Sequence, residues 1–314
     1  MNFRAVRGPY GGANAFLRAL KKEFARRGIR VVHDVEGRYD VALLNALTDG
    51  IDADCARRIA ERGVPIVHRK VGYRVSGSPD MRAVDPDGVV HGDRLQLEFS
   101  PHISHTIFQS EYSREVFTAG GFTGKSTIIH NGVDEAIFNQ SIGAPMRRRQ
   151  RPGWHSREPL RVAISTWSTD VNKGFDDYVS IDGELATTDV TVTLLGSVRA
   201  GIVFEHIRTE GPYRRRRLAR RLKEQHVLLQ LARWETCSNA LIEGINCGMP
   251  VIYLDSGSNK EIADPYGVEY TGDFNQSIAL IEERYAELQE RTRTNPYRMT
   301  LVAPRYQEVL ESVI

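Results

Sequence analysis

The sequence has little of several features that mark special classes of protein. Only three cysteines occur among its 314 residues, Cys55, Cys237 and Cys247. They are too few and too scattered for a disulfide framework or a zinc site. No apolar run approaches the roughly 20 residues of a membrane-spanning helix. The first residues, MNFRAVRGPYGG, lack the apolar core of a signal peptide. We therefore expect a cytoplasmic protein without disulfides.

An excess of one charge is also missing. The chain has 42 Lys and Arg against 40 Asp and Glu, a net charge of +2, so overall charge does not indicate a nucleic-acid partner. Basic residues nevertheless gather in two clusters, at 147–151 and at 214–223. Such clusters usually form a solvated surface, but they also suit peripheral contact with the anionic inner face of a membrane.

Short β-branched or aliphatic runs alternate with helical patterns along the chain. In the first half the expected strands are Phe3–Val6, Arg30–His33, Val41–Leu44, Pro65–His68, His105–Phe108 and Ser126–Ile129, and the expected helices are Ala13–Arg27, Asp52–Arg62 and Tyr112–Ala119. In the second half the strands are Leu160–Ser165, Val190–Leu195, Val227–Leu229 and Val251–Leu254, and the helices are Phe175–Leu185, Tyr213–Glu224, Asn239–Asn246, Gln276–Thr292 and Pro304–Val313. This alternation predicts parallel sheets covered by helices on both faces.

The two series are separated by Ser141–Glu158, which holds glycine, proline and arginine without apolar periodicity. We interpret this stretch as a linker. The expected fold is therefore α/β, with two Rossmann-like doubly wound domains over residues 1–150 and 151–296. Residues 297–314 are expected to form a helix that packs back on the N-terminal domain. The Gly-, Pro- and Asp-rich segment Val71–Leu97 has no assignment.

The strongest chemical signal is a pair of glutamates. Glu235 and Glu243 stand eight positions apart, and a Cys-Gly-Met-Pro-Val-Ile run follows, with Glu261 further on. Both carboxylates are expected at the carboxyl ends of strands, where open α/β sheets bind ligands. The backbone N–H groups of Ser238, Asn239 and Ala240 would lie at a helix N-terminus, which attracts anions. The alternative is an ordinary crossover with two solvated glutamates.

The order of the motifs along the chain carries a resemblance to a known family. They are Gly11-Gly12, Phe108–Ser113, Ile129–Asp134, Lys173-Gly174, Leu194–Gly196 and Glu235–Glu261. This set resembles the retaining glycosyltransferases of the GT-B fold, specifically glycosyltransferase family 4. The resemblance implies a nucleotide-sugar donor site in the C-terminal domain and an acceptor side in the N-terminal domain. It implies that Glu243 binds the ribose hydroxyls of the donor and that Glu235 faces the donor sugar.

Lys173 precedes an expected helix, and a cation there can hold a diphosphate and stabilise it as a leaving group. The resembled family has an arginine about five residues before this lysine, but the stretch Ser165–Lys173 contains none. Trp167, Ser168 and Asn172 are candidate substitutes by hydrogen bonding, and Arg233 is a candidate from elsewhere in the chain.

Glycines before the first helix allow close approach of a ligand to the backbone. The loop Gly8-Pro9-Tyr10-Gly11-Gly12 lacks the dinucleotide fingerprint, so no nicotinamide cofactor is indicated. The resemblance implies that Gly11, Gly12 and Gly196 lie near the donor. It places Tyr10 and the strand-end residues His68 and Arg69 on the acceptor side. A plain turn and a structural histidine are the alternatives.

The resemblance implies transfer of a sugar from a nucleoside diphosphate, UDP or GDP, to a hydroxyl acceptor with retention at the anomeric carbon. Such a reaction serves polysaccharide, lipid-linked glycan or natural-product glycoside synthesis. No Asp-x-Asp pair lies near the expected donor site, so we expect no metal and no other cofactor. The alternatives are a GT-B nucleotide-sugar epimerase and a non-catalytic nucleotide-sugar-binding subunit, the latter motivated by the missing arginine.

Overall fold

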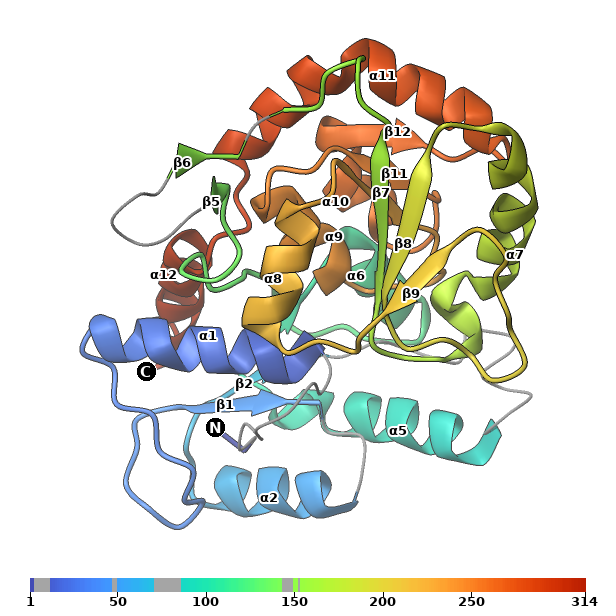
Figure 1. Ribbon diagram of the computed structural model, residues 1–314. Helices are drawn as coiled ribbons and strands as arrows, with labels where there is room; N and C mark the ends of the chain where they lie inside the picture. Colours follow the sequence, from blue (N-terminus) through green and yellow to red (C-terminus); the bar gives the residue numbers. More distant parts are fainter. Residues whose placement is uncertain (3–11, 47–49, 71–85, 143–148, 152) are drawn as a thin grey trace. The chain divides into compact units, whose positions relative to one another are not determined.

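The computed structural model describes residues 1–2, 12–46, 50–70, 86–142, 149–151 and 153–314 (Figure 1). These residues form two compact units. The chain passes from the first unit to the second between Asn131 and Gly132, and it returns between Arg298 and Met299. The crossing therefore comes before residue 150, where the sequence suggested a domain boundary.

The first unit contains a parallel sheet with the strand order β1-β2-β3-β4. Its strands are β1 (Ala42–Asn45), β2 (Ile66–Arg69), β3 (His105–Phe108) and β4 (Ser126–Ile128). Its helices are α2 (Gly50–Glu61), α5 (Pro86–Glu98), α6 (Glu111–Ala119), α12 (Met299–Glu311) and, from Phe16 onward, α1 (Gly12–Arg26).

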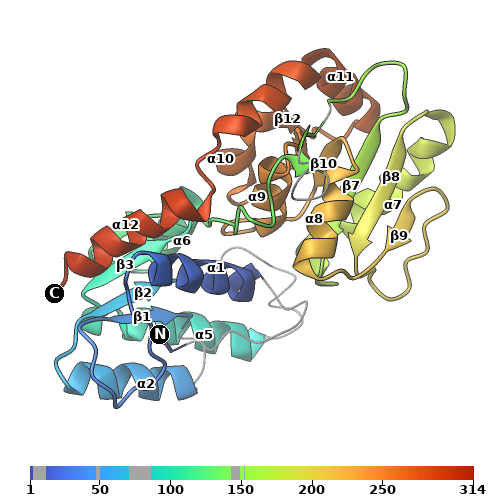
Figure 2. The same cartoon turned by 60° about the vertical axis from the view of Figure 1, so that its left-hand side comes forward.

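Side chains of this sheet alternate between two apolar clusters. Leu43 and Val67 pack with α1 and α12 on one face, and Leu44 and Ile66 pack with α2 on the other (Figure 2). This is the period-2 alternation of a strand buried on both faces. The C-terminal helix α12 thus completes the core of the first unit.

The second unit contains a parallel sheet with the strand order β12-β11-β10-β7-β8-β9. Its strands are β7 (Arg161–Thr166), β8 (Thr191–Gly196), β9 (Arg208–Glu210), β10 (Val227–Gln230), β11 (Val251–Tyr253) and β12 (Gly267–Glu269). Counted from β7, this is the doubly wound Rossmann order 3-2-1-4-5-6. Its winding reverses between β7 and β10, and ligands of such sheets bind at the carboxyl ends of the strands that flank the reversal.

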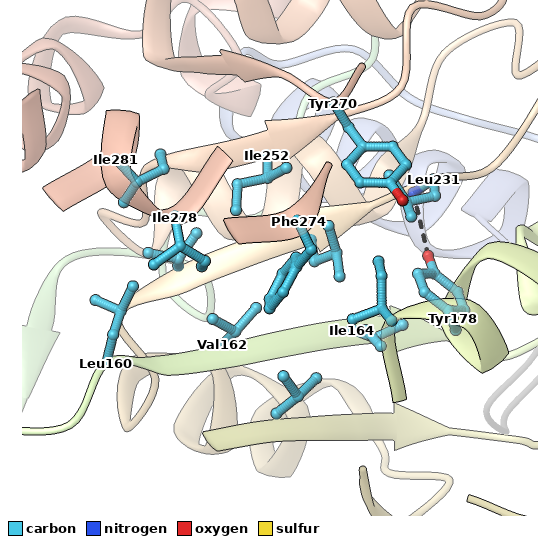
Figure 3. Packing of buried hydrophobic residues seen from close by; sticks show 14 of the residues in the cluster. Leu160, Val162, Ile164, Tyr178, Leu231, Ile252, Tyr270, Phe274, Ile278 and Ile281 are labelled. Atoms are coloured by element: carbon cyan, nitrogen blue, oxygen red, sulfur yellow. Dashed lines mark hydrogen bonds between the residues drawn. The ribbon is translucent and has the colours of Figure 1, made fainter. Parts of the chain in front are cut away.

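Helices cover both faces of this sheet. They are α7 (Phe175–Glu184), α8 (Arg215–Lys223), α9 (Asn239–Asn246), α10 (Asn259–Ala263) and α11 (Phe274–Arg291). Val162 and Ile164 of β7 pack with α7 and α11 in the cluster of Figure 3. Ala163, between them, faces the opposite cluster with α8, α9 and α10.

The described parts of the segment expected as a linker pack on the second unit. β5 (Ser141–Ile142) pairs antiparallel with β6 (Arg149–Gln150). The Arg151 guanidinium donates to the carbonyl oxygens of Lys223 (3.0 Å) and Gly248 (2.7 Å). These contacts fasten the segment to α8 and to the end of α9.

Two expected strands have a different outcome from the rest. Arg30–His33 is not a strand, because its backbone pairs with no described strand. Val31 nevertheless packs against the apolar core of the first unit. Phe3–Val6 lies outside the described residues. The structure adds α5 within the unassigned stretch 71–97, and it adds the short strands β9 and β12.

Candidate active site

The loops that leave β7 and β10 are held together at the reversal of the sheet. After β7 the chain forms a turn of 3-10 helix, η3 (Val171–Lys173), and then Gly174 and α7. The Arg233 N–H donates to the Asn172 carbonyl (2.7 Å), and the Asn172 side-chain amide donates to the Arg233 carbonyl (3.2 Å). The Leu231 N–H donates to the Tyr178 hydroxyl (3.1 Å), which the apolar core buries (Figure 3). The two loops therefore have fixed positions relative to each other.

Gly174 makes this close approach of the loops feasible. Its φ is 77°, in the left-handed region. A Cβ on this residue would lie 2.6 Å from the Leu231 carbonyl oxygen. A side chain here would push apart the two loops that carry Lys173 and Arg233.

The two residues expected to be catalytic meet in the structure. The Lys173 ammonium donates to Oε1 of Glu235, and the two side chains are 17% and 20% exposed. Both groups are thus accessible to a ligand while they neutralise each other. The pair brings a cation and a carboxylate to the strand ends at which the Rossmann order predicts a ligand.

Arg233 forms a second ion pair across the same two loops. Its NH1 and NH2 groups donate to Oδ2 (2.6 Å) and Oδ1 (3.1 Å) of Asp177. Hydrogen bonding to this carboxylate raises the pKa of Arg233. Asp177 did not stand out in the sequence, because an acidic residue in the first turn of a helix is ordinary.

Glu243 lies on α9 and is buried. Burial raises the pKa of its carboxyl group to about 7, and the nearby charge of Arg215 opposes that shift. A carboxyl group in this environment can change its charge when a ligand arrives. Arg215 was visible in the sequence only as part of a basic cluster.

The beginning of α9 is partly committed to internal contacts. The Ser238 hydroxyl caps the helix by accepting from the Leu241 N–H (3.5 Å), and it accepts a second hydrogen bond from the Gln230 amide (2.9 Å). Asn239 and Ala240 occupy the first turn and are half-buried. The hydroxyl of Ser238 is therefore structural, and the backbone of the first turn carries the anion-binding potential.

Trp167 and Gly196 lie beside each other at the ends of β7 and β8. Gly196 pairs in register with Thr166, the residue before Trp167. A Cβ on Gly196 would come within 1.5 Å of the Thr166 carbonyl oxygen, so glycine is required here for strand packing. The Trp167 side chain is 55% exposed, and a large aromatic ring left in solvent can stack on a ligand.

The residues expected on the acceptor side have buried side chains at the end of β2. The Arg69 guanidinium is 1% exposed. It donates to the amide oxygens of Asn45 (2.6 Å), Gln109 (2.5 Å) and Asn131 (2.6 Å). His68 is fully buried, its ring nitrogen Nε2 contacts the Ala46 carbonyl, and burial holds its pKa well below the usual value.

Neither side chain is accessible to an acceptor in this structure. Arg69 ties the last residue of β1 to the segments that follow β3 and β4, and the His68 ring is fully buried. The glycine loop carries Tyr10, which was also expected on the acceptor side, and Gly11 and Gly12, which were expected near the donor. Tyr10 and Gly11 lie outside the described residues, and Gly12 is the first residue of α1.

The described residues contain neither a cluster of metal-ligating side chains nor a membrane-spanning helix. No group of three or more His, Cys, Asp or Glu side chains lies close enough to hold a metal ion in the parts of the chain that the structure describes. Within the same ranges, no helix combines the length and apolar character needed to cross a membrane.

Comparison with known proteins supports the fold. No protein-family model matches the sequence, and no curated protein matches it. Among solved structures, sucrose-phosphate synthase from Thermosynechococcus elongatus superposes with a TM-score of 0.63 at 14% identity, covering 96% of this chain and 78% of that one. The catalytic domain of starch synthase IV from Arabidopsis thaliana, bound to ADP and acarbose, gives 0.63 at 16% identity, covering 97% and 78%. A glycosyltransferase from Rickettsia africae gives 0.63 at 10% identity, covering 99% and 84%.

These similarities, together with the two parallel-sheet units, show that the chain has the GT-B fold of glycosyltransferases. This confirms the fold expected from the sequence.

Proposed function

We propose that this protein is a retaining glycosyltransferase that moves a sugar from a nucleoside diphosphate, UDP or GDP, to a hydroxyl acceptor. One observation carries the proposal: Lys173, Glu235 and Arg233 converge at the switch point of the Rossmann sheet in the second unit. The fold shared with nucleotide-sugar enzymes supports it. One of these relatives was solved with ADP bound.

The described residues divide the chemistry between them. Lys173 and the N-terminus of α9 supply positive potential for the diphosphate. Glu243 accepts hydrogen bonds from the ribose hydroxyls, and Glu235 faces the donor sugar. A cation fixed at the leaving group stabilises the charge that develops there as the glycosidic bond breaks.

Retention follows if bond breaking and bond making occur on the same face of the sugar. The bond between the anomeric carbon and the phosphate oxygen breaks, and its electron pair stays on the diphosphate. The acceptor oxygen forms the new bond to the anomeric carbon. Its proton passes to the departing phosphate oxygen, so no second carboxylate is needed as base.

We also propose that the reaction needs no divalent metal. Lys173 and the helix N-terminus supply positive charge without one. Turnover should therefore persist in excess chelator. Complete loss of turnover that added magnesium or manganese restores would contradict this proposal.

The test of the main proposal is direct. The purified protein is incubated with UDP-, GDP-, ADP- and dTDP-sugars and a panel of hydroxyl acceptors, and release of nucleoside diphosphate is measured. The anomeric configuration of the product is read by NMR. Acceptor-dependent release with a retained configuration is the expected result, and Glu243→Ala serves as the donor-site control.

A non-catalytic nucleotide-sugar-binding subunit is the second candidate. The pairing of charges favours it to this extent: Lys173 and Arg233 are both paired with carboxylates, and the lysine lacks the preceding arginine of the resembled family. Nucleotide-sugar binding without turnover for any acceptor would select this candidate. Conversion of the donor without an acceptor would instead indicate an epimerase.

We further propose that α8 contacts an anionic membrane surface. The helix Arg215–Lys223 contains six basic residues and no acidic residue. Arg221 pairs with Glu210, and Lys223 donates to Asn139. Four exposed arginines remain, one at the N-cap and three on the helix: Arg214, Arg216, Arg217 and Arg220. They form no ion pair with a described residue. We call these four the α8 arginines. Their clustered charge complements an anionic lipid surface.

A further inference from the structure

Arg233 arrives at the site from a different loop than the one that carries Lys173. Lys173 ends η3 after β7, whereas Arg233 follows β10. The hydrogen bonds between Arg233 and Asn172 fix the Arg233 backbone against the residue that directly precedes Lys173. Two cations from separate loops are therefore anchored next to each other by the main chain.

Asp177 orients the guanidinium without exhausting it. An arginine side chain carries five N–H donors in a rigid plane, and the carboxylate of Asp177 engages NH1 and NH2. Among the described residues Asp177 is its only hydrogen-bond partner, and the Arg233 side chain is 33% exposed. The guanidinium is thus held in one orientation while further donors remain accessible from solvent.

The position of Asp177 is itself informative. It lies in the first turn of α7, where the helix dipole stabilises a carboxylate. A carboxylate beside an anion-binding site opposes anion binding unless it holds a cation there. The bidentate contact to Arg233 gives it that role.

The backbone between the two charged loop residues is strained. Trp234, which separates Arg233 from Glu235, has a φ of 56°. A bulky aromatic residue rarely adopts the left-handed region. Such strain persists only where the surroundings impose it, and it clusters at ligand sites. Here the Trp234 N–H donates to the Ser256 hydroxyl (3.0 Å), which helps to hold the conformation.

We infer that Arg233, positioned by Asp177, is the second cation that binds the diphosphate and confers selectivity for a β-phosphate. The inference rests on the proposed nucleoside diphosphate donor. The sequence before Lys173 lacks an arginine, and the β10 loop supplies one in its place. Asp177 acts only through Arg233, so it is a positioning residue.

The test compares the affinities of the diphosphate and the monophosphate of the same nucleoside. Calorimetry with UDP and UMP, GDP and GMP, ADP and AMP, and dTDP and dTMP identifies the base that wild type binds and the ratio of the two affinities. Arg233→Ala should reduce that ratio about 10-fold, because charge-assisted hydrogen bonds to the β-phosphate are lost. Arg233→Lys should keep part of the ratio, and Asp177→Asn should lower it to an intermediate value.

A matched control is available in the same unit. Arg221 donates to both carboxylate oxygens of Glu210, and these side chains are 28% and 29% exposed, much like Arg233 and Asp177. Arg221→Ala removes this bidentate ion pair, together with a second contact to Glu224, and should leave the affinity ratio unchanged. Thermal unfolding of each variant reports any general loss of stability.

The outcomes separate this inference from the proposed function. If wild type binds none of the nucleotides, the proposed function fails. If wild type prefers the diphosphate and Arg233→Ala keeps the full preference, the function stands and the inference is overturned. Equal wild-type affinity for the two nucleotides also overturns it. A purely structural ion pair would lower stability and weaken both nucleotides alike.

Discussion

Four charged side chains, in the loops after β7 and β10 and in the first turn of α7, form two neutral pairs. Lys173 is held by Glu235 and Arg233 by Asp177. Under the proposed function, the diphosphate of the donor would compete with Glu235 for the lysine. The lysine is therefore already oriented toward an anion before the donor binds, which lowers the cost of organising the site.

Lys173 is expected to act mainly on the chemical step. Negative charge on the diphosphate grows as the glycosidic bond breaks, so the lysine binds the transition state better than the ground state. Lys173→Ala should lower kcat at least about 100-fold and change the donor KM much less. Lys173→Gln keeps a hydrogen-bond donor without the charge and should recover little.

Steady-state kinetics of both lysine variants at saturating acceptor provide the measurement. If both keep the wild-type kcat and only KM rises, Lys173 is a binding residue, and Arg233 is the next cation to test by kinetics.

Glu243 should make nucleotide binding depend on pH. Its pKa is raised to about 7 by burial, and ribose hydroxyls donate to the ionised form. Donor affinity should therefore rise as pH increases toward 7 and level off above it, by about 10-fold per pH unit at most. Calorimetry between about pH 5.5 and 8.5 measures this. Glu243→Gln cannot titrate at this position but still shows the titration of the nucleotide's own phosphate, so the difference between the two profiles isolates Glu243. Identical pH profiles for the two proteins would assign the titration elsewhere.

The same shift affects folding stability with a defined sign. A carboxyl group with a raised pKa in the folded state binds more protons there than in the unfolded chain. Its contribution is fully present below pH 4.5, the ordinary value, and is lost as pH rises through about 7. Glu243→Gln should therefore gain stability relative to wild type above pH 7.

At the scale of helices and strands, the exposed side of α8 carries a cluster of basic residues that the packing of the sheet does not require. Ala219 and Leu222 bury one side of it, and the α8 arginines occupy the exposed side. Each basic residue near an anionic bilayer contributes about 1 kcal/mol to binding. Replacing the α8 arginines with glutamine should therefore weaken binding to anionic vesicles by at least about 10-fold. Vesicles with about 30 mol% phosphatidylglycerol serve as the anionic surface.

Co-sedimentation with vesicles of that composition and with pure phosphatidylcholine vesicles measures the effect. The control variant removes the same number of charges from exposed arginines that pair with carboxylates, namely Arg57, Arg114, Arg291 and Arg293. Equal loss of binding in both variants would show that net charge, not the face of α8, is responsible. Binding by wild type to neither vesicle would remove the membrane proposal.

The sequence predicted elements well where apolar periodicity is strong. Asn239–Asn246 is a helix with the expected bounds, and β3 coincides with His105–Phe108. It missed β9 and β12, since strands as short as Arg208–Glu210 carry no period. It began the last helix at Pro304, but α12 starts at Met299 and includes that proline. Proline is a frequent first helical residue, so Pro304 was interpreted as the start, and the turn of helix before it was missed.

For the site, the sequence identified charged residues but not their partners. Lys173 and Glu235 were expected at one site, and the structure joins them. The bidentate contact between Asp177 and Arg233 was not predictable, because it depends on how two loops far apart in the chain align at the sheet. The burial of Arg69 had no local signal either, since its three amide partners come from three separate segments.

At the scale of the whole molecule, the last helix of the chain belongs to the first unit, although the second unit precedes it in the sequence. The chain leaves the first unit after Asn131 and re-enters it at Met299. The helix α12 then buries six residues in that unit, Met299, Val302, Ala303, Tyr306, Val309 and Leu310. Folding of the first unit therefore requires the end of the chain, whereas the core of the second unit is completed before it.

Deleting residues 299–314 should therefore unfold the first unit and leave the second unit able to bind a nucleoside diphosphate. Burial of an apolar side chain contributes roughly 1.5–3 kcal/mol, so loss of α12 removes an amount comparable to the whole stability of a typical domain, about 5–15 kcal/mol. Limited proteolysis with mass mapping should show cleavage throughout residues 16–131 and protection of 153–298, and calorimetry with the diphosphate that wild type binds should show retained affinity. Deleting only Ile314, which follows α12 and is 71% exposed, is the control and should change neither result. If the first unit stays protected without α12, the helix is dispensable for its core. If the second unit stays folded but no longer binds the nucleotide, the donor site needs residues beyond those of the β7 and β10 loops and α9.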